Sequence, residues 1–223
     1  MTSDFLERFP DRTEAGRALA RQLSEYADQD CVVMALPRGG VPVGLEVANA
    51  LSAPLELLLV RKIGAPNHPE YAIGAVVDGA DPQVVMNEGL PPALAAPAGY
   101  VETEVQRLLE EIERRRQLYL GGRTPIPVAG KAVIVVDDGI ATGATARVAI
   151  AALSRHKPSS VILAVPVAAE DALDKLRPAV DRILCLLMPS PFQSVGQHYL
   201  DFEQVSDQEV ITALRSREAD KTV

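Results

Sequence analysis

Short runs of consecutive apolar residues, separated by segments with helical periodicity, constrain the fold of this 223-residue chain most strongly. The runs CVVMAL, VIVV and SVILAVPV occupy residues 31–36, 133–136 and 160–167. A strand with one solvated face alternates apolar and polar residues, whereas a strand covered by helices on both faces is apolar throughout. The alternation of such runs with helical segments predicts an α/β protein whose parallel sheet lies between two layers of helices.

Capping signals and periodicity locate the helices. Asp11 followed by Glu14 forms a capping box that predicts a helix over 11–26, and SDQE at 206–209 predicts another at the C-terminal end. We also predict helices over 41–51, from near Thr142 to about His156, and near 170–177.

The longest helix is expected over 97–120. Its apolar stripe comprises Val101, Val105, Leu108, Leu109 and Ile112, and we interpret RLLEEIERRR at 107–116 as a solvated face. This helix could pack on the core or on another subunit, so a homo-oligomer is possible.

Two further β segments are expected between these helices. LELLLVR at 55–61 predicts a second buried strand. The β-rich runs within 72–88 are joined by an Asp-Gly turn, which favours a hairpin.

Composition restricts the class of protein. The chain is 48% hydrophobic and 23% charged, and with no repeat or clear linker we predict one domain over 1–223. The absence of an 18-residue apolar stretch and of an apolar signal segment in MTSDFLERFPDR predicts a cytoplasmic protein without a membrane span. A formal charge of −8 argues against nucleic acid as the main partner. We interpret Cys31 and Cys185 as small buried hydrophobes and predict no structural metal.

The stretch VVDDGIATGATA at 135–146 places two acids directly before a glycine turn rich in hydroxyls. Asp137 and Asp138 follow a buried strand, and ligands of parallel sheets gather at the carboxyl ends of the strands. A helix beginning near Thr142 offers free N–H groups that suit a phosphate, while carboxylates suit the vicinal hydroxyls of a ribose. A ribose 5-phosphate satisfies both halves of the stretch.

Other readings of this stretch fit less well. A Walker A loop needs Gly-Lys-Ser/Thr, but Gly143 is followed by Ala144. A dinucleotide fingerprint needs GxGxxG with its acid about 20 residues later. A polar turn that only caps a helix would account for either aspartate alone, and it is a minority interpretation for the pair.

Three segments together resemble type I phosphoribosyltransferases. VIVVDDGIATGAT at 133–145 is similar to their ribose-phosphate motif. LPRGGVPVG at 36–44 looks like their first pyrophosphate loop, and LVRKIGAPNHPEYAIGAV at 59–76 resembles their second pyrophosphate segment. The resemblance is greatest to bacterial members whose acceptor is unassigned. It implies a three-layer core with a β-hairpin insertion and a C-terminal hood, the hood elements lying at about 62–90 and 189–205.

The resemblance also implies a donor, 5-phosphoribosyl 1-pyrophosphate carrying Mg²⁺, and a role for each matched residue. The residues implied for the ribose and its 5-phosphate are Asp137, Asp138, Gly139, Ala141, Thr142, Gly143, Ala144 and Thr145. Those implied for the pyrophosphate are Arg38, Gly39, Gly40, Arg61 and Lys62. The three cations Arg38, Arg61 and Lys62 would stabilise the leaving group, and the metal would be carried by the donor. By themselves, RGG is equally a strand-to-helix turn and RK a solvated strand end.

The chain departs from the hypoxanthine-guanine branch in two places. That branch has a proton-accepting aspartate where this chain has Ala141, and a purine-reading lysine where this chain has Pro166 and Val167. PFQSVGQHYLDF at 191–202 resembles a hood segment, which implies that Phe192 stacks on the acceptor and Asp201 binds its edge. A core position for Phe192 and a surface position for Asp201 are equally favoured.

The sequence therefore leaves three candidate functions. The first is transfer of a phosphoribosyl group to a nitrogen of an unknown, base-like acceptor. The second is a sensor that binds the same donor without turnover, which the missing proton acceptor at Ala141 favours. The third is a hydrolase that uses water as the acceptor.

Surface or helix-capping roles are expected for His68, His156 and His198, since no pair has metal-ligand spacing.

Overall fold

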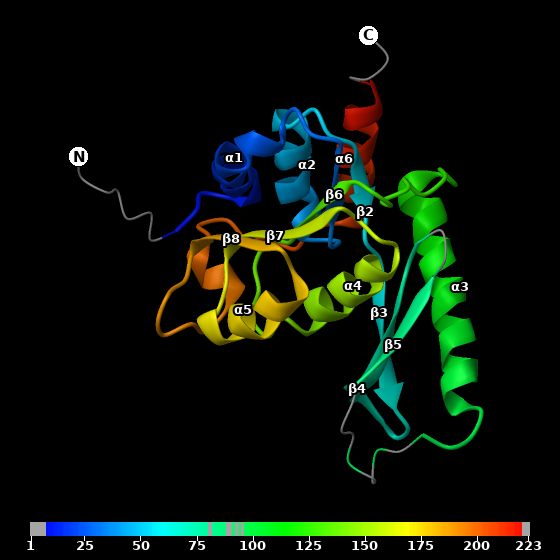
Figure 1. The fold of residues 1–223 in the computed structure, drawn as a ribbon. Helices are drawn as coiled ribbons and strands as arrows, with labels where there is room; N and C mark the ends of the chain where they lie inside the picture. The colour runs from blue at the N-terminus through cyan, green and yellow to red at the C-terminus, as the bar shows by residue number, and fades with distance from the viewer. Residues whose placement is uncertain (1–7, 80–81, 88–90, 92–93, 95, 220–223) are drawn as a thin grey trace.

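The computed structural model describes residues 8–79, 82–87, 91, 94 and 96–219 (Figure 1). The helices are α1 (Arg12–Gln22), α2 (Gly40–Ala50), α3 (Tyr100–Leu120), α4 (Ala144–Arg155), α5 (Glu170–Leu176) and α6 (Asp207–Ala219). The strands are β1 (Cys31–Ala35), β2 (Leu55–Leu57), β3 (Val60–Ala65), β4 (His68–Val77), β5 (Gln83–Met86), β6 (Ala132–Val136), β7 (Ser160–Val167) and β8 (Arg182–Leu187). Short 3₁₀ turns lie at Ser24–Tyr26, Arg177–Ala179 and Val195–His198.

The core is a parallel sheet with the strand order β2-β1-β6-β7-β8. Helices α1, α2 and α6 cover one face, and α4 and α5 cover the other (Figure 1). Neighbouring residues of one strand serve opposite faces: Ile134 packs with the first layer, and Val133 and Val135 with the second. The predicted three-layer α/β fold is confirmed, and burial on both faces explains why its strands are apolar throughout.

A second, antiparallel sheet of β3, β4 and β5 projects beside the core, with α3 along one side (Figure 1). The predicted hairpin is confirmed, since Val77 pairs with Gln83 across β4 and β5. The prediction of one strand over 55–61 is wrong. The chain leaves the parallel sheet after Leu57, and β3 begins at Val60 as the antiparallel partner of β4. Leu58 and Leu59, which lie between β2 and β3, are both buried, so the apolar pattern does not change where the chain passes from one sheet to the other.

Helix α3 buries more than its apolar stripe. Leu108 and Ile112 are buried as predicted, but Arg116 is buried too, and its Nη1 lies 2.6 Å from Oδ2 of Asp78. Glu111, on the same helix, is bonded to Arg61 of β3. The prediction of a solvated charged face is therefore confirmed for the exposed residues of the run and wrong for Glu111 and Arg116, which contact the antiparallel sheet and the turn after β4.

The C-terminal segment is joined to the start of the chain by backbone hydrogen bonds. The Phe9 N–H donates to the His198 carbonyl at 2.8 Å, and the Leu200 N–H donates to the Phe9 carbonyl at 2.8 Å. The predicted capping box of α6 is confirmed, because the Ser206 N–H donates to Glu209 Oε2 and the Glu209 N–H to Ser206 Oγ. Residues 198–201 are thereby paired with the residues that precede α1.

The remaining predictions about single residues are mixed. Cys31 is buried and Cys185 half-buried, and both are free thiols. His156 caps the C-terminal end of α4 and His68 is exposed, as expected, whereas Nε2 of His198 is buried. Among the helices described, none combines the length and apolar character needed to cross a bilayer.

Candidate functional site

Two loops meet at the carboxyl edge of the parallel sheet. Ala35 and Val136 are register partners at the ends of β1 and β6, so the loops that follow start side by side. A Cβ on Gly39 would lie 2.0 Å from Oδ2 of Asp138, and a Cβ on Gly40 would lie 3.0 Å from Cα of Asp137. The glycines of the first loop are therefore what lets it pack directly on the acids of the second. The sequence predicted both loops as parts of one site, and the structure brings them together.

The two acids are both buried but have different charged neighbours. The Asp138 N–H donates to Oδ1 of Asp137 at 2.9 Å. Loss of hydration and the neighbouring charge of Asp138 hold the pKa of Asp137 well above its ordinary value. Burial also raises the pKa of Asp138, but the guanidinium of Arg12 opposes this shift, its Nε lying 2.8 Å from Asp138 Oδ2. The pKa of both acids is therefore raised by burial, and the guanidinium of Arg12 opposes the shift at Asp138.

The loop after the acids leads to an open helix end. Ile140 anchors it, because its N–H donates to the Val167 carbonyl and its own carbonyl accepts from the Ala169 N–H, both at 2.9 Å. Gly143 has φ +73° and caps α4 without a side-chain hydrogen bond, while Thr142 and Thr145 are exposed. The first turn of a helix carries N–H groups with no partner inside the helix. With the helix dipole, these groups favour an anion here.

Each predicted pyrophosphate-binding cation is paired with an acid. Arg61 Nε lies 2.8 Å from Glu111 Oε1, and Lys62 Nζ lies 2.7 Å from Glu70 Oε2. Both cations line a pocket of about 300 Å³ together with Thr145 from the first turn of α4. The structure thus brings Arg61 and Lys62 to the predicted phosphate-binding helix end.

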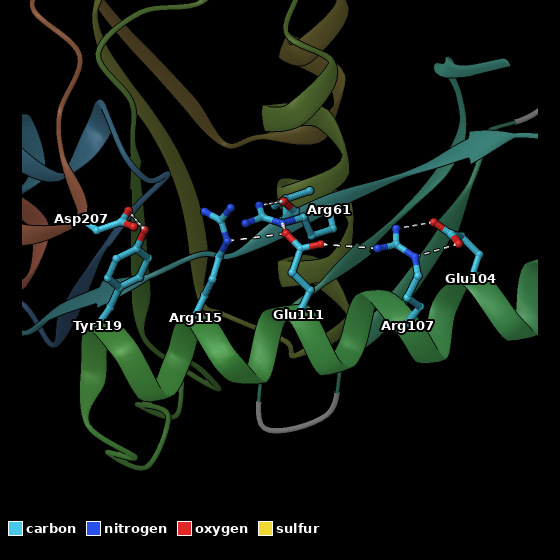
Figure 2. A network of polar contacts seen from close by, with 8 residues as sticks. Arg61, Glu104, Arg107, Glu111, Arg115, Tyr119 and Asp207 are labelled. Carbon is cyan, nitrogen blue, oxygen red and sulfur yellow. Dashed lines mark hydrogen bonds and ion pairs between the residues drawn. The ribbon is translucent and has the colours of Figure 1, made fainter.

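Arg38 has a different environment. Its Nη1 lies 3.3 Å from Oδ1 of Asp207, the first residue of α6, and the Tyr119 hydroxyl donates to the same oxygen at 2.6 Å. Figure 2 shows Tyr119, Arg115 and Glu111 in a row along α3, between Asp207 and Arg61. Helix α3 therefore contacts both Asp207, the partner of Arg38, and Arg61 of the antiparallel sheet.

Several residues of this region were not predicted as site residues from the sequence. Arg12, Tyr199, Glu111 and Asp207 touch the predicted site residues, and each comes from an element far away along the chain. The Tyr199 hydroxyl donates to the backbone carbonyl of Asp138 at 2.6 Å. Burial raises the pKa of Tyr199, so its hydroxyl stays protonated and can keep this bond. Only the fold brings such residues together.

The two residues proposed for the acceptor lie on the C-terminal segment. Phe192 is half-buried and its ring stacks on that of His198, with centroids 5.8 Å apart. Asp201 is exposed, and its Oδ1 accepts from the Glu203 N–H at 3.2 Å. The segment reaches the site through Val195, whose Cγ1 would lie 2.5 Å from a Cβ on Gly139. Acceptor binding by Phe192 and Asp201 stays a prediction.

Comparison with known proteins gives one consistent result. The profile of the phosphoribosyl transferase domain matches residues 3–201. Two Mycobacterium tuberculosis proteins, Rv0571c and MT0597, are provisionally named phosphoribosyl transferases and are each 41% identical over 209 residues, which is 94% of this chain and 47% of theirs. The chain therefore spans about half the length of these relatives. The crystal structure of TT1426 from Thermus thermophilus is 38% identical with a TM-score of 0.80, covering 94% of this chain and 98% of that one. The chain belongs to the phosphoribosyl transferase domain family.

Proposed function

We propose that this domain transfers a phosphoribosyl group from 5-phosphoribosyl 1-pyrophosphate to a nitrogen of a base-like acceptor and releases pyrophosphate. One observation carries the proposal: two acids suited to hydroxyls and an open helix end suited to phosphate follow each other on one continuous segment, residues 137–145. A ribose 5-phosphate carries vicinal hydroxyls and a phosphate, so it can use both the acids and the helix end. Membership of the family supports the same class of reaction.

The reaction has a clear electrostatic demand. As the anomeric C–O bond breaks, positive charge grows on the sugar and negative charge on the pyrophosphate. Cations aimed at the leaving group lower this barrier. Arg61 and Lys62 border the pocket at the α4 end, and Arg38 lies in the loop packed on the acids. To act, each would exchange its present acid partner for a pyrophosphate oxygen, so the ion pairs hold these side chains ready beside the site.

Magnesium would enter with the donor. Among the residues that the structure describes, no three His, Cys, Asp or Glu side chains gather closely enough to hold a metal ion. Mg²⁺ prefers oxygen ligands and is commonly bound through substrate phosphates rather than by a complete protein cage. The site fits an ion whose ligands come largely from the donor, where it would neutralise charge on the leaving pyrophosphate.

The acceptor is constrained by what is missing from the loop. Ala141 is exposed beside Thr142 and cannot take a proton from an acceptor. We infer that the acceptor presents a nitrogen lone pair without needing a base at this position. Pro166 and Val167 at the end of β7 offer no side-chain donor, which disfavours an oxopurine.

The test is pyrophosphate release measured with the donor, Mg²⁺ and a panel of nitrogen heterocycles. We expect release with at least one acceptor and its loss in the Asp137→Asn, Asp138→Asn double variant. Asp174→Asn is the control, since Asp174 is exposed on α5 and pairs only with Arg177 among the contacts described. Unchanged release by the folded double variant would reject the proposal.

Ala141 also favours a second function, a sensor that binds the donor without turnover. Tight donor binding with no product for any acceptor would support it. Ribose 5-phosphate release without an acceptor would instead identify a hydrolase.

A further inference from the structure

Arg12, the first residue of α1, connects the acid pair to the C-terminal segment. Its Nε donates to Asp138 Oδ2 at 2.8 Å and its Nη1 donates to the Glu203 carbonyl at 2.8 Å. Its guanidinium carbon lies 3.8 Å from the ring centroid of Phe202. Two edges of the guanidinium are used by protein oxygens and one face by a ring. This arrangement suits a residue that holds other groups in place, rather than one that binds a ligand itself.

The packing of α1 explains how Arg12 reaches the site. Gly16 follows Arg12 by one helical turn, and a Cβ there would lie 2.8 Å from the Val43 carbonyl of α2. The absence of a side chain at Gly16 therefore lets α1 approach α2 closely. Because α2 begins directly after Gly39, this approach places the start of α1 against the loop that packs on Asp138.

The contact is buried on both sides. Only 11% of the Arg12 side chain and 15% of the Asp138 side chain are exposed. A buried carboxylate without a cation would be poorly solvated, and a second acid next to it adds repulsion. The titratable groups that lie against Asp138 in the described structure are Arg12 of α1, Asp137 of its own loop and Tyr199, whose hydroxyl donates to the Asp138 carbonyl. The loop before α2 contributes Gly39. Arg12 is the cation of this set.

We propose that Arg12 is a positioning residue of the sugar site, which fixes the carboxylate of Asp138 in the orientation that receives the ribose hydroxyls and ties the segment around Phe202 and Glu203 to it. The inference rests on the proposed function, because it assumes that Asp138 binds a sugar. It assigns a role in that site to α1, an element outside all three matched motifs.

The test compares two ligands that use different halves of the loop. Ribose 5-phosphate needs both the acids and the helix end, whereas inorganic phosphate needs only the helix end. We expect Arg12→Gln to weaken ribose 5-phosphate binding by about tenfold while phosphate binding changes by less than about twofold, both measured by calorimetry with Mg²⁺ present. Arg17→Gln is the matched control, because Arg17 lies on the same helix and pairs with Glu14 and Glu46 at the surface.

The pH profile gives a readout that a purely structural role would not move. Without the guanidinium, the pKa of Asp138 rises further, so Arg12→Gln should require a higher pH to reach its maximal affinity for ribose 5-phosphate. Arg12→Lys retains the charge but loses the two-edged geometry, so it should keep the wild-type pH profile and recover part of the affinity.

The possible results distinguish failure of the role proposed for Arg12 from failure of the proposed function. Equal losses for both ligands, or wild-type affinity in Arg12→Gln, would overturn the role of Arg12 while leaving the proposed function intact. If Arg12→Gln does not fold, Arg12→Lys decides: a loss confined to ribose 5-phosphate supports the role, and no loss or an equal loss overturns it. Failure of the wild-type protein to bind ribose 5-phosphate or the donor would refute the proposed function itself.

Discussion

Replacing Gly39 by alanine tests the geometry on which the site depends. Gly39 has φ −59° and ψ −35°, values that alanine adopts freely. With no neighbour, the substitution would stabilise the protein by about 0.4–1 kcal/mol, because it restricts the unfolded chain. The obstacle is Asp138: the new Cβ would stand 2.0 Å from Oδ2 and 2.5 Å from Cγ.

The size of the effect follows from these distances. Real Cβ atoms essentially never approach a heavy atom within 3.0 Å, so the 2.0 Å contact must open by at least about 1 Å. The same oxygen accepts a hydrogen bond from Arg12 Nε at 2.8 Å, so the carboxylate cannot move without straining that bond. Overpacking of this kind costs about 1–3 kcal/mol. A displacement of about 1 Å in a reacting complex can cost about 100-fold in rate.

A double-mutant cycle isolates this contact. Urea unfolding would be measured for wild type, Gly39→Ala, Asp138→Ala and the double variant. We expect Gly39→Ala to lower the free energy of unfolding by about 1–3 kcal/mol in wild type and to be neutral or stabilising when Asp138 is alanine. An equal cost in both backgrounds would refute the packing of the glycine loop on the acid.

Three further predictions concern other buried groups. Because the pKa of Asp137 is raised in the folded protein, the free energy of unfolding falls as the pH rises above the ordinary pKa of aspartate. Asp137→Asn should raise the free energy of unfolding at neutral pH and flatten this decline, measured by urea unfolding at a series of pH values. An unchanged dependence of the unfolding free energy on pH would contradict this. Arg116→Met leaves Asp78 buried without its cation and should cost about 3–5 kcal/mol by urea unfolding, whereas Lys175→Met at an exposed pair should cost less than about 1. Burial raises the pKa of Cys185 to about 11, so a thiol reagent at about pH 8 should label this half-buried thiol more slowly in the native protein than in the unfolded one; equal rates in the two states would count against this.

Local sequence patterns predicted the fold well where the physics is local. The apolar runs gave the strands of the parallel sheet, and the Asp11 and Ser206 capping boxes gave two helix starts. The break between β2 and β3 was not predicted, because Leu58 and Leu59 are buried and the apolar pattern is the same whether they belong to one sheet or the other. A change of strand partner depends on long-range packing, which a local window does not contain.

The candidate site divides in the same way. The acid pair and its glycine turn were visible because hydroxyl and phosphate chemistry is encoded within one loop, residues 137–145. The partners of its charges were not. Arg12 reaches Asp138 across 126 positions of sequence and Asp207 reaches Arg38 across 169, so only the folded arrangement identifies them.

The most direct test of the central claim is a crystal structure of the protein soaked with 5-phosphoribosyl 1-pyrophosphate and Mg²⁺. We expect the 5-phosphate at the amides that open α4, between Gly143 and Thr145, and the ribose hydroxyls at Asp137 and Asp138. An empty loop, with the donor bound at another site such as the separate cavity of about 160 Å³ beside Arg116, would contradict the proposed sugar site.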